Sequence, residues 1–149
     1  MVRKGEPIVV LLVEDDPAHA EIVKRNFESG RIANRLIHVA DGQLALDYLK
    51  RVNEFKDPEM SPRPGLILLD LRLPKVDGIE VLNKIKADRK LKLIPVVVLT
   101  SSKEDNDVLK SYDLGVNSYI RKPVDFDQFV DTVKQIGFYW LLINEQAPK

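Results

Sequence analysis

Short, uninterrupted apolar runs are the most prominent pattern along the chain. They lie at Ile8–Val13, Leu66–Leu69 and Ile94–Leu99, and a weaker run lies at Ser118–Ile120. Runs that are this short and lack polar alternation are typical of strands buried on both faces, as in a parallel sheet. A fifth stretch, Leu36–Ala40, partly alternates, which predicts a strand near the edge of the sheet.

Helical patterns separate these runs. Apolar residues recur at intervals of three and four in five segments, at Ala20, Val23 and Phe27; Leu44, Ala45, Tyr48, Leu49 and Val52; Ile79, Val81, Leu82 and Ile85; Val108, Leu109 and Tyr112; and Phe126, Phe129, Val130 and Val133. Asp16, Asp41 and Asp125 are placed to cap three of these helices at their starts, and Gly30 and Gly115 to end two of them.

The resulting order is strand then helix, repeated five times. Strands that alternate with helices are joined by right-handed crossovers into a parallel sheet covered on both faces. We therefore predict an α/β fold, a doubly wound five-stranded parallel sheet. No repeat or linker divides the chain, and the irregular stretch Asn53–Gly65, with its three prolines, predicts a long surface loop.

Composition narrows the class of protein. The chain has 149 residues, of which 44% are hydrophobic and 31% charged, as expected for one globular domain. Acidic and basic residues number 23 each, so no overall basic character indicates direct nucleic-acid binding. The absence of cysteine excludes disulfides, thiolate metal sites and cysteine nucleophiles. No apolar run approaches the roughly 18 residues of a membrane helix, and we expect a cytoplasmic protein.

Polar side chains follow four of the predicted strands at the points where they end. In open α/β sheets, ligands bind beyond the carboxyl ends of the strands, so these side chains are expected to converge. Clustered carboxylates repel one another unless a cation lies among them, and oxygen ligands suit Mg²⁺. A lysine and a hydroxyl opposite the metal can bind an anion. The arrangement predicts a phosphoryl group near Asp70, surrounded by the other strand-end groups Glu14–Asp16, Thr100–Ser102 and Arg121–Pro123.

Four segments together resemble the receiver domain of two-component response regulators. They are Leu11–Pro17, Leu68–Gly78, Val98–Ser101 and Tyr119–Pro123. The resemblance covers about residues 7–145 and implies a flavodoxin-like (βα)5 fold, with residues 1–149 forming a single receiver domain and no output domain. Within the family, the chain resembles single-domain regulators associated with phytochromes, because of its long loop before the second apolar run and its apolar C-terminal segment.

The resemblance implies a role for each residue around the expected metal. Asp70 is the phosphoacceptor, and Mg²⁺ offsets the charge on the phosphoryl group and the nucleophile. Asp15 is a direct metal ligand, and Glu14 acts nearby through a water molecule. The backbone carbonyl of Arg72 is the remaining protein ligand.

The resemblance also implies a switch. Thr100 and Lys122 bind phosphoryl oxygens, and the Lys122–Pro123 peptide is expected to be cis. Thr100 moves towards the phosphoryl group and vacates space that Tyr119 can fill. The implied function is a signalling domain that changes its protein contacts, with self-catalysed phosphotransfer and slow autodephosphorylation as its only reactions. Its implied partner is a histidine kinase, of the phytochrome type in this subgroup.

The C-terminal region contains six consecutive apolar residues. One face of a helix cannot bury six residues in a row, so some of them form an exposed patch. A symmetric homodimer is the commonest way to cover such a patch, and a covering loop is the alternative. The predicted interface residues are Phe138, Tyr139, Trp140, Leu141, Leu142 and Ile143.

Two other functions are alternatives to the signalling role. A haloacid-dehalogenase-like hydrolase also uses a strand-end aspartate with Mg²⁺, but it expects a second aspartate two residues later, where this chain has Arg72. A nucleotide-binding domain needs a glycine-rich turn after the first strand, and Glu14–Pro17 has none. His19 and His38 have no partner at a metal-binding spacing, so we interpret them as a helix and a strand residue without a ligand role.

Overall fold

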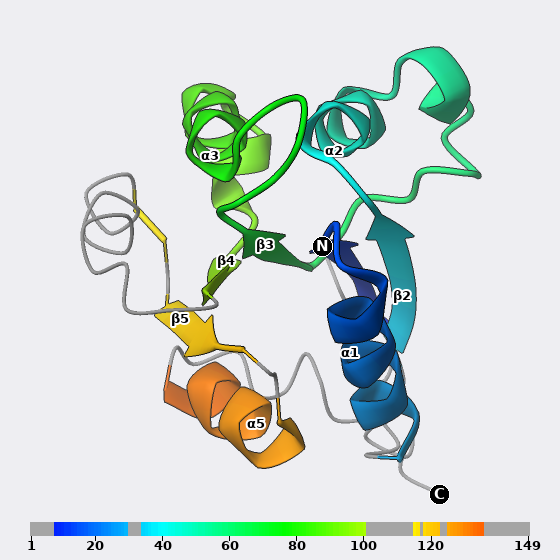
Figure 1. Ribbon diagram of the computed structural model, residues 1–149. Coiled ribbons are helices and arrows are strands. Elements are labelled where there is room, and N and C mark those ends of the chain that lie inside the picture. Colours follow the sequence, from blue (N-terminus) through cyan, green and yellow to red (C-terminus); the bar gives the residue numbers. More distant parts are fainter. Residues whose placement is uncertain (1–7, 30–33, 101–114, 117, 123–124, 136–149) are drawn as a thin grey trace, which may run out of the picture.

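The computed structural model contains one parallel sheet (Figure 1). It describes residues 8–29, 34–100, 115–116, 118–122 and 125–135. The strands occur in the order β2-β1-β3-β4-β5 across the sheet, so the predicted five-stranded parallel sheet is confirmed and the partly alternating strand lies at an edge. Their bounds are β1 (Ile8–Val13), β2 (Asn34–Val39), β3 (Leu66–Asp70), β4 (Val96–Thr100) and β5 (Ser118–Arg121).

Helices cover both faces of the sheet. The described helices are α1 (Pro17–Ser29), α2 (Gly42–Lys50), α3 (Gly78–Ala87) and α5 (Phe126–Gln135), with short 3₁₀ turns η1 (Asn53–Phe55) and η2 (Leu91–Leu93). α2 and α3 lie on one face, and α1 and α5 lie on the other (Figure 1). The helix predicted around Val108, Leu109 and Tyr112 lies outside the described residues, as does Gly30.

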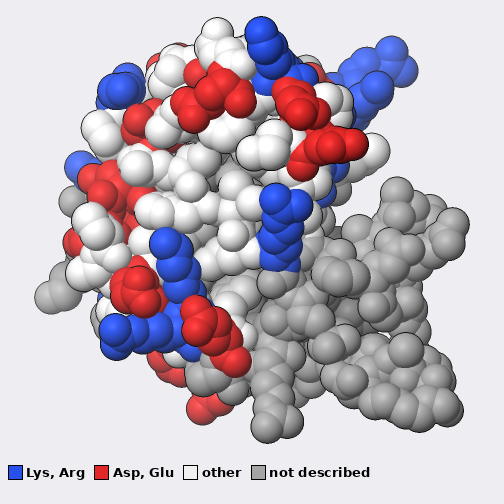
Figure 2. Space-filling view, turned by 90° about the vertical axis from the view of Figure 1, so that its right-hand side faces the viewer, with Lys and Arg blue, Asp and Glu red and all other residues white. Residues whose placement is uncertain are grey.

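The surface seen in Figure 2 carries mixed charge. Lys and Arg side chains lie among Asp and Glu side chains around an uncharged central area, and the described residues of this face form no large area of one sign. Of the helices that the structure describes, none is long and apolar enough to span a membrane. The mixture on this face agrees with the equal numbers of acidic and basic residues in the chain.

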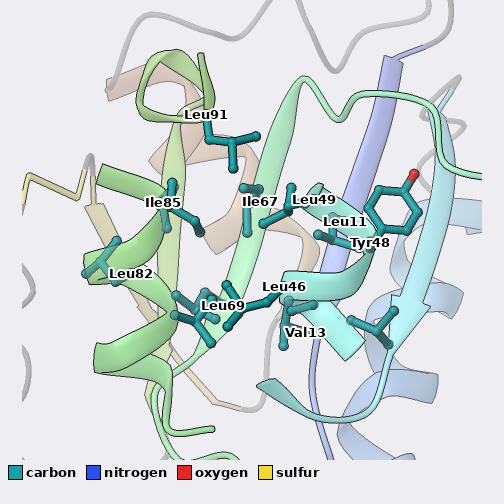
Figure 3. Packing of buried hydrophobic residues seen from close by; sticks show 14 of the residues in the cluster. Leu11, Val13, Leu46, Tyr48, Leu49, Ile67, Leu69, Leu82, Ile85 and Leu91 are labelled. Atoms are coloured by element: carbon teal, nitrogen blue, oxygen red, sulfur yellow. The ribbon is translucent and has the colours of Figure 1, made fainter. Parts of the chain in front are cut away.

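The two central strands β3 and β4 are buried along their whole length. Ile67 and Leu69 of β3 pack in the core cluster beneath α2 and α3 (Figure 3), whereas Leu66 and Leu68 pack in the cluster beneath α1 and α5. Successive residues of a strand point to opposite faces, and here both faces meet apolar side chains. This two-sided burial is the physical reason why the sequence of these strands lacks polar alternation.

Aspartate side chains cap three helices, as predicted. The amide groups of Leu44 and Ala18 donate to the carboxylates of Asp41 and Asp16, each at 2.8 Å. Asp125 accepts in the same way at the start of α5. These bonds satisfy amide groups that have no partner within the first turn of a helix.

Helix α2 ends earlier than its apolar pattern predicted. It ends at Lys50, and Arg51 adopts a left-handed conformation with φ 56° at the C-cap. Val52 therefore leaves the helix and is 40% exposed. The prediction that Val52 belongs to the buried stripe of α2 was wrong. The left-handed residue at the end of a helix is usually glycine, but here it is arginine, so no glycine in the sequence marks the end of α2.

The long loop after α2 packs back onto that helix. Ser61 is buried, and its hydroxyl group donates to the carbonyl of Phe55 at 2.9 Å. The Tyr48 hydroxyl group donates to the carbonyl of Pro62 at 2.6 Å, and Arg51 Nε donates to the carbonyl of Ser61 at 3.1 Å. Side chains of α2 and of its C-cap residue thus satisfy loop carbonyls that would otherwise lack partners, which fixes the loop's position.

We expect truncation of a β3 residue to destabilise the protein strongly. Ile67 is fully buried, so Ile67→Ala removes apolar contacts and leaves a cavity, at a cost of about 2–5 kcal/mol in the free energy of unfolding. Leu93 is 78% exposed, and Leu93→Ala should change that free energy by less than about 0.5 kcal/mol. Urea unfolding of both variants measures the difference, and equal losses would contradict the two-sided core.

Candidate functional site

The carboxyl ends of four strands bring the predicted site residues to one edge of the sheet. Glu14 and Asp15 follow β1, Asp70 ends β3, Thr100 ends β4 and Lys122 follows β5. β1 is paired with β3, β3 with β4, and β4 with β5. The end of each strand is therefore adjacent to the next, although the residues lie far apart in the sequence.

A buried ammonium group lies between two buried carboxylates. Lys122 Nζ is 2.7 Å from Asp70 Oδ2 and 2.7 Å from Glu14 Oε1. None of the three side chains is more than 5% exposed. Ion pairs removed from water need close partners to offset the loss of hydration, and these distances provide them.

The electrostatics of this group are unbalanced. Burial raises the pKa of Glu14 to about 7, the hydrogen bond from Lys122 opposes the rise, and the nearby charge of Asp70 adds to it. Burial alone would lower the pKa of Lys122, but its hydrogen bonds and its charge interactions with Asp70 and Glu14 raise that pKa above its ordinary value. One ammonium group thus pairs with two carboxylates, and when both carboxylates are ionised the group of three side chains has a net negative charge.

The acidic side chains fit a divalent cation. One oxygen atom from each of Glu14, Asp15 and Asp70 lies within 4.8 Å of the others, and Asp15 is the exposed member of the three. Carboxylate oxygens are the ligands that Mg²⁺ and Mn²⁺ prefer. Burial raises the pKa of Glu14 and the nearby charge of Asp70 adds to the rise, so a cation beside Asp15 would favour the ionised form of these carboxylates.

The second oxygen of Asp70 has a backbone partner. The amide group of Arg72 donates to Asp70 Oδ1 at 3.0 Å, and the Arg72 side chain is exposed. The two oxygens of Asp70 therefore have different partners, Lys122 on one and Arg72 on the other. The role of the Arg72 carbonyl as a metal ligand stays a prediction.

Thr100 and Tyr119 lie on the same face of the sheet. The register pairs Val98 with Tyr119 and Thr100 with Arg121, so Thr100 and Tyr119 share a face on neighbouring strands. Thr100 is buried, and its carbonyl accepts a hydrogen bond from the Lys122 amide at 2.7 Å. Tyr119 is half-buried against the core cluster beneath α2 and α3. This placement is compatible with the predicted switch, which stays a prediction.

Two groups of predicted site residues lie outside the described part of the chain. Pro123 is one, so the cis Lys122–Pro123 peptide stays a prediction. The interface residues Phe138, Tyr139, Trp140, Leu141, Leu142 and Ile143 are the other, and the homodimer predicted from them also stays a prediction.

Sequence reasoning missed one contact of the site. His38 Nε2 lies 2.7 Å from the backbone carbonyl of Glu14. The sequence predicts no ligand role for His38, and that stays a prediction; the acidic cluster of the described residues consists of Glu14, Asp15 and Asp70. The contact joins residues 24 positions apart and depends on the β1–β2 register. Only the occurrence of a polar residue near the end of an edge strand could have hinted at it.

The fold and the site define a class of signalling protein. The model of the response regulator receiver domain family matches residues 10–134, and the chain belongs to this family. Receiver domains are the phosphoacceptor domains of two-component signalling, in which their partners are histidine kinases, and they bind a divalent metal ion.

Two curated relatives match almost the whole chain. The probable methanogenesis regulatory protein FilR2 of Methanothrix harundinacea is 47% identical over 141 residues, which cover 95% of this chain and 88% of the relative. Response regulator Rcp1 of Synechocystis sp. is 45% identical over 139 residues, which cover 93% and 92% of the two chains. The similarity therefore extends over the length of both proteins.

Solved structures of response regulators are also similar to this chain over nearly its whole length. The bacteriophytochrome response regulator RtBRR is similar with a TM-score of 0.83 and 47% identity, covering 96% of this chain and 86% of that one. The Mn²⁺-bound form of Rcp1 has a TM-score of 0.76 and 44% identity, with 91% and 95% covered. The phosphorylated cyanobacterial phytochrome response regulator RcpA has a TM-score of 0.77 and 40% identity, with 97% and 100% covered.

Burial of Glu14 makes the stability of the metal-free protein depend on pH. From its ordinary value of 4.5 to about 7, Glu14 is ionised in the unfolded chain and protonated in the folded one. Unfolding then releases a proton, so the free energy of unfolding falls as pH rises through this range, by a few kcal/mol at most. Glu14→Gln should remove this fall, and urea unfolding in EDTA between about pH 5 and about pH 8 measures it.

Glu21→Gln is the matched control, because Glu21 is an exposed glutamate of α1. This variant should keep the pH dependence of the natural chain. If the free energy of unfolding fell equally with pH in Glu14→Gln and in the natural chain, Glu14 would not be the group responsible.

Proposed function

We propose that the protein is a response regulator in which Asp70 accepts a phosphoryl group from a histidine kinase with the aid of Mg²⁺. The observation that carries this proposal is the placement of Lys122 Nζ at 2.7 Å from both Asp70 and Glu14, beside the exposed Asp15. A nucleophilic carboxylate, a cation-binding pair and a positively charged ammonium group are thereby brought together at one end of the sheet.

The chain's own residues supply the parts of a phosphotransfer site. An oxygen of Asp70 forms a bond to phosphorus while the P–N bond of a phosphohistidine breaks and its electron pair stays on the imidazole. Glu14, Asp15 and the Arg72 carbonyl would hold the metal, and Mg²⁺ supplies positive charge that offsets the negative charges brought together. Lys122 then pairs with a phosphoryl oxygen, and the Thr100 hydroxyl donates to another.

The proposed output is a change of protein contacts. Thr100 moves towards the phosphoryl group, and Tyr119 turns into the space that Thr100 leaves, which alters the surface around β4 and β5. The half-buried position of Tyr119 beside the core supports this step, because an aromatic ring at a boundary can occupy two packed positions. Apart from phosphotransfer and slow loss of the phosphoryl group, the domain has no reaction of its own.

The kinase partner we propose is of the phytochrome type. The similar structures RtBRR and RcpA are described as phytochrome response regulators, and the similarity covers nearly the whole of this chain. We place the exchange in the cytoplasm, in agreement with a chain that contains no cysteine. We propose no direct contact with nucleic acid, because the acidic and basic residues balance.

We also propose a homodimer through the C-terminal segment Phe138–Ile143. Its six consecutive apolar residues exceed what one helix face can bury. Burial of two or three such side chains per chain contributes roughly 1.5–3 kcal/mol each before association costs. That gain is sufficient for a dimer at micromolar concentrations.

Asp70→Asn should abolish phosphorylation. With Mg²⁺ and acetyl phosphate, intact-mass spectrometry of the natural chain should show one acid-stable, base-labile phosphoryl group, because the carboxylate is the nucleophile. The amide of the variant cannot form the acyl phosphate. Asp77→Asn changes an exposed aspartate near the same edge and should leave labelling intact. Normal labelling of Asp70→Asn would reject the acceptor assignment.

Charged residues in the C-terminal segment should dissociate the homodimer. Light scattering at roughly tens of micromolar should give the mass of two chains for the natural protein and of one chain for the Tyr139→Glu, Leu142→Glu double variant, since charge in an apolar interface is costly to desolvate. Leu93→Glu places the same charge at an exposed apolar site and should remain dimeric. A monomeric natural protein, with or without a phosphoryl mimic, would exclude the homodimer.

A further inference from the structure

We propose that the junction of β2 and α2, residues His38–Gly42, positions the metal site although it supplies none of the three carboxylates. The proposal rests on the proposed function, because the site in question is the one assigned there. The junction contacts both segments that carry the expected ligands. One is Glu14–Asp15, which follows β1, and the other is the loop Leu71–Asp77, which follows Asp70.

The first contact lies where the β1–β2 ladder ends. The register pairs Val13 with Val39, and the amide of Glu14 donates to the carbonyl of Val39 at 3.1 Å. The carbonyl of Glu14 then lies 2.7 Å from His38 Nε2. A carbonyl oxygen only accepts, so the hydrogen is on Nε2 of the imidazole. β2 therefore binds the amide and the carbonyl of Glu14 alike, one through its backbone and one through a side chain.

This double contact determines where the two consecutive carboxylates point. The Glu14 side chain is fully buried and reaches Lys122, whereas Asp15 is exposed and still lies within the 4.8 Å acidic cluster. The amide of Asp16 donates back to Glu14 Oε2 at 3.1 Å. The orientation of the Glu14–Asp15 peptide determines where the Asp15 side chain lies relative to the Glu14 side chain. Rotation of this peptide would therefore move one of the two carboxylates out of the cluster.

The second contact is between Gly42 and the loop after Asp70. A Cβ atom on Gly42 would lie 1.9 Å from the carbonyl oxygen of Val76, so no side chain fits at this position. The Gly42 amide is 3.4 Å from the carbonyl of Pro74, and Lys75 Nζ is 3.6 Å from Asp41 Oδ2. Lys75 has a φ of 67°, a conformation that costs free energy and persists only where neighbours impose it.

The junction His38–Gly42 thus connects the two ligand segments. The cap of Asp41 on the amide of Leu44, at 2.8 Å, joins the junction to the first turn of α2. Displacement of His38 or Gly42 would change the position of Glu14 and Asp15 relative to Asp70 without removing any ligand. Outer partners of this kind typically alter metal affinity by about 10–100-fold when they are mutated.

Calorimetric titration of the full chain with Mg²⁺, and separately with Mn²⁺, tests the proposal. His38→Phe keeps an aromatic ring but removes the donor, and we expect it to bind metal on the order of tenfold more weakly. His38→Gln restores a donor and should recover most of the affinity, which a merely space-filling role of the ring would not produce. Gly42→Ala should weaken binding to a similar extent, because the loop after Asp70 must move.

Two control variants distinguish a positioning effect on metal affinity from a general loss of stability and from the loss of a metal ligand. Tyr48→Phe removes one buried hydrogen bond, to the Pro62 carbonyl, at the other end of α2, and should lower stability in EDTA without changing metal affinity. Asp15→Asn removes an expected ligand and should bind metal weakly or not at all. Failure of the natural chain to bind either metal would reject the site and, with it, the proposed function.

The positioning role alone is overturned if Asp15→Asn loses affinity while His38→Phe and Gly42→Ala bind like the natural chain. It is also overturned if His38→Gln is as impaired as His38→Phe. Should His38→Phe not fold, Gly42→Ala decides the question, because weakened binding supports the junction and unchanged binding overturns it.

Discussion

The ammonium group of Lys122 between the carboxylates of Glu14 and Asp70 is the interaction on which the rest of the structure depends. Each of these side chains would be costly to bury alone, and together they are stable only at close range. They come from three strand ends, so the sheet must hold those ends where Lys122 Nζ can lie 2.7 Å from an oxygen of each carboxylate. The apolar strands β3 and β4, buried on both faces, supply the rigidity that such spacing requires.

Much of the fold follows from local properties of the sequence. Val10–Val13 and Leu66–Leu69 are apolar without interruption because both faces of their strands are covered, and that property is visible in the residues themselves. The cap at Asp41 is similarly local. The meeting of Asp70 and Lys122 was also predictable, because the ends of parallel strands lie at the same edge of a sheet whichever helices connect them.

Other features depend on contacts that no local pattern contains. Arg51 ends α2 in a left-handed conformation that its side chain does not suggest, because its guanidinium group binds a carbonyl of the following loop. His38 reaches Glu14 only through the register of β2 against β1. Gly42 lacks a side chain because of Val76, more than thirty residues later. In each case the cause lies in tertiary packing rather than in propensity.

The acidic residues after the strands also affect the chain before it folds. Ile8–Val13 is a short apolar segment of the kind that stacks between chains into aggregates, and one of its two partners in the sheet is the distant β3. Glu14, Asp15 and Asp16 follow it at once, and Asp70 follows Leu66–Leu69. Like charges at these positions repel when identical segments stack in register, so they act as gatekeepers. The carboxylates proposed to bind the metal and the phosphoryl group would thus also oppose self-association of the unfolded chain.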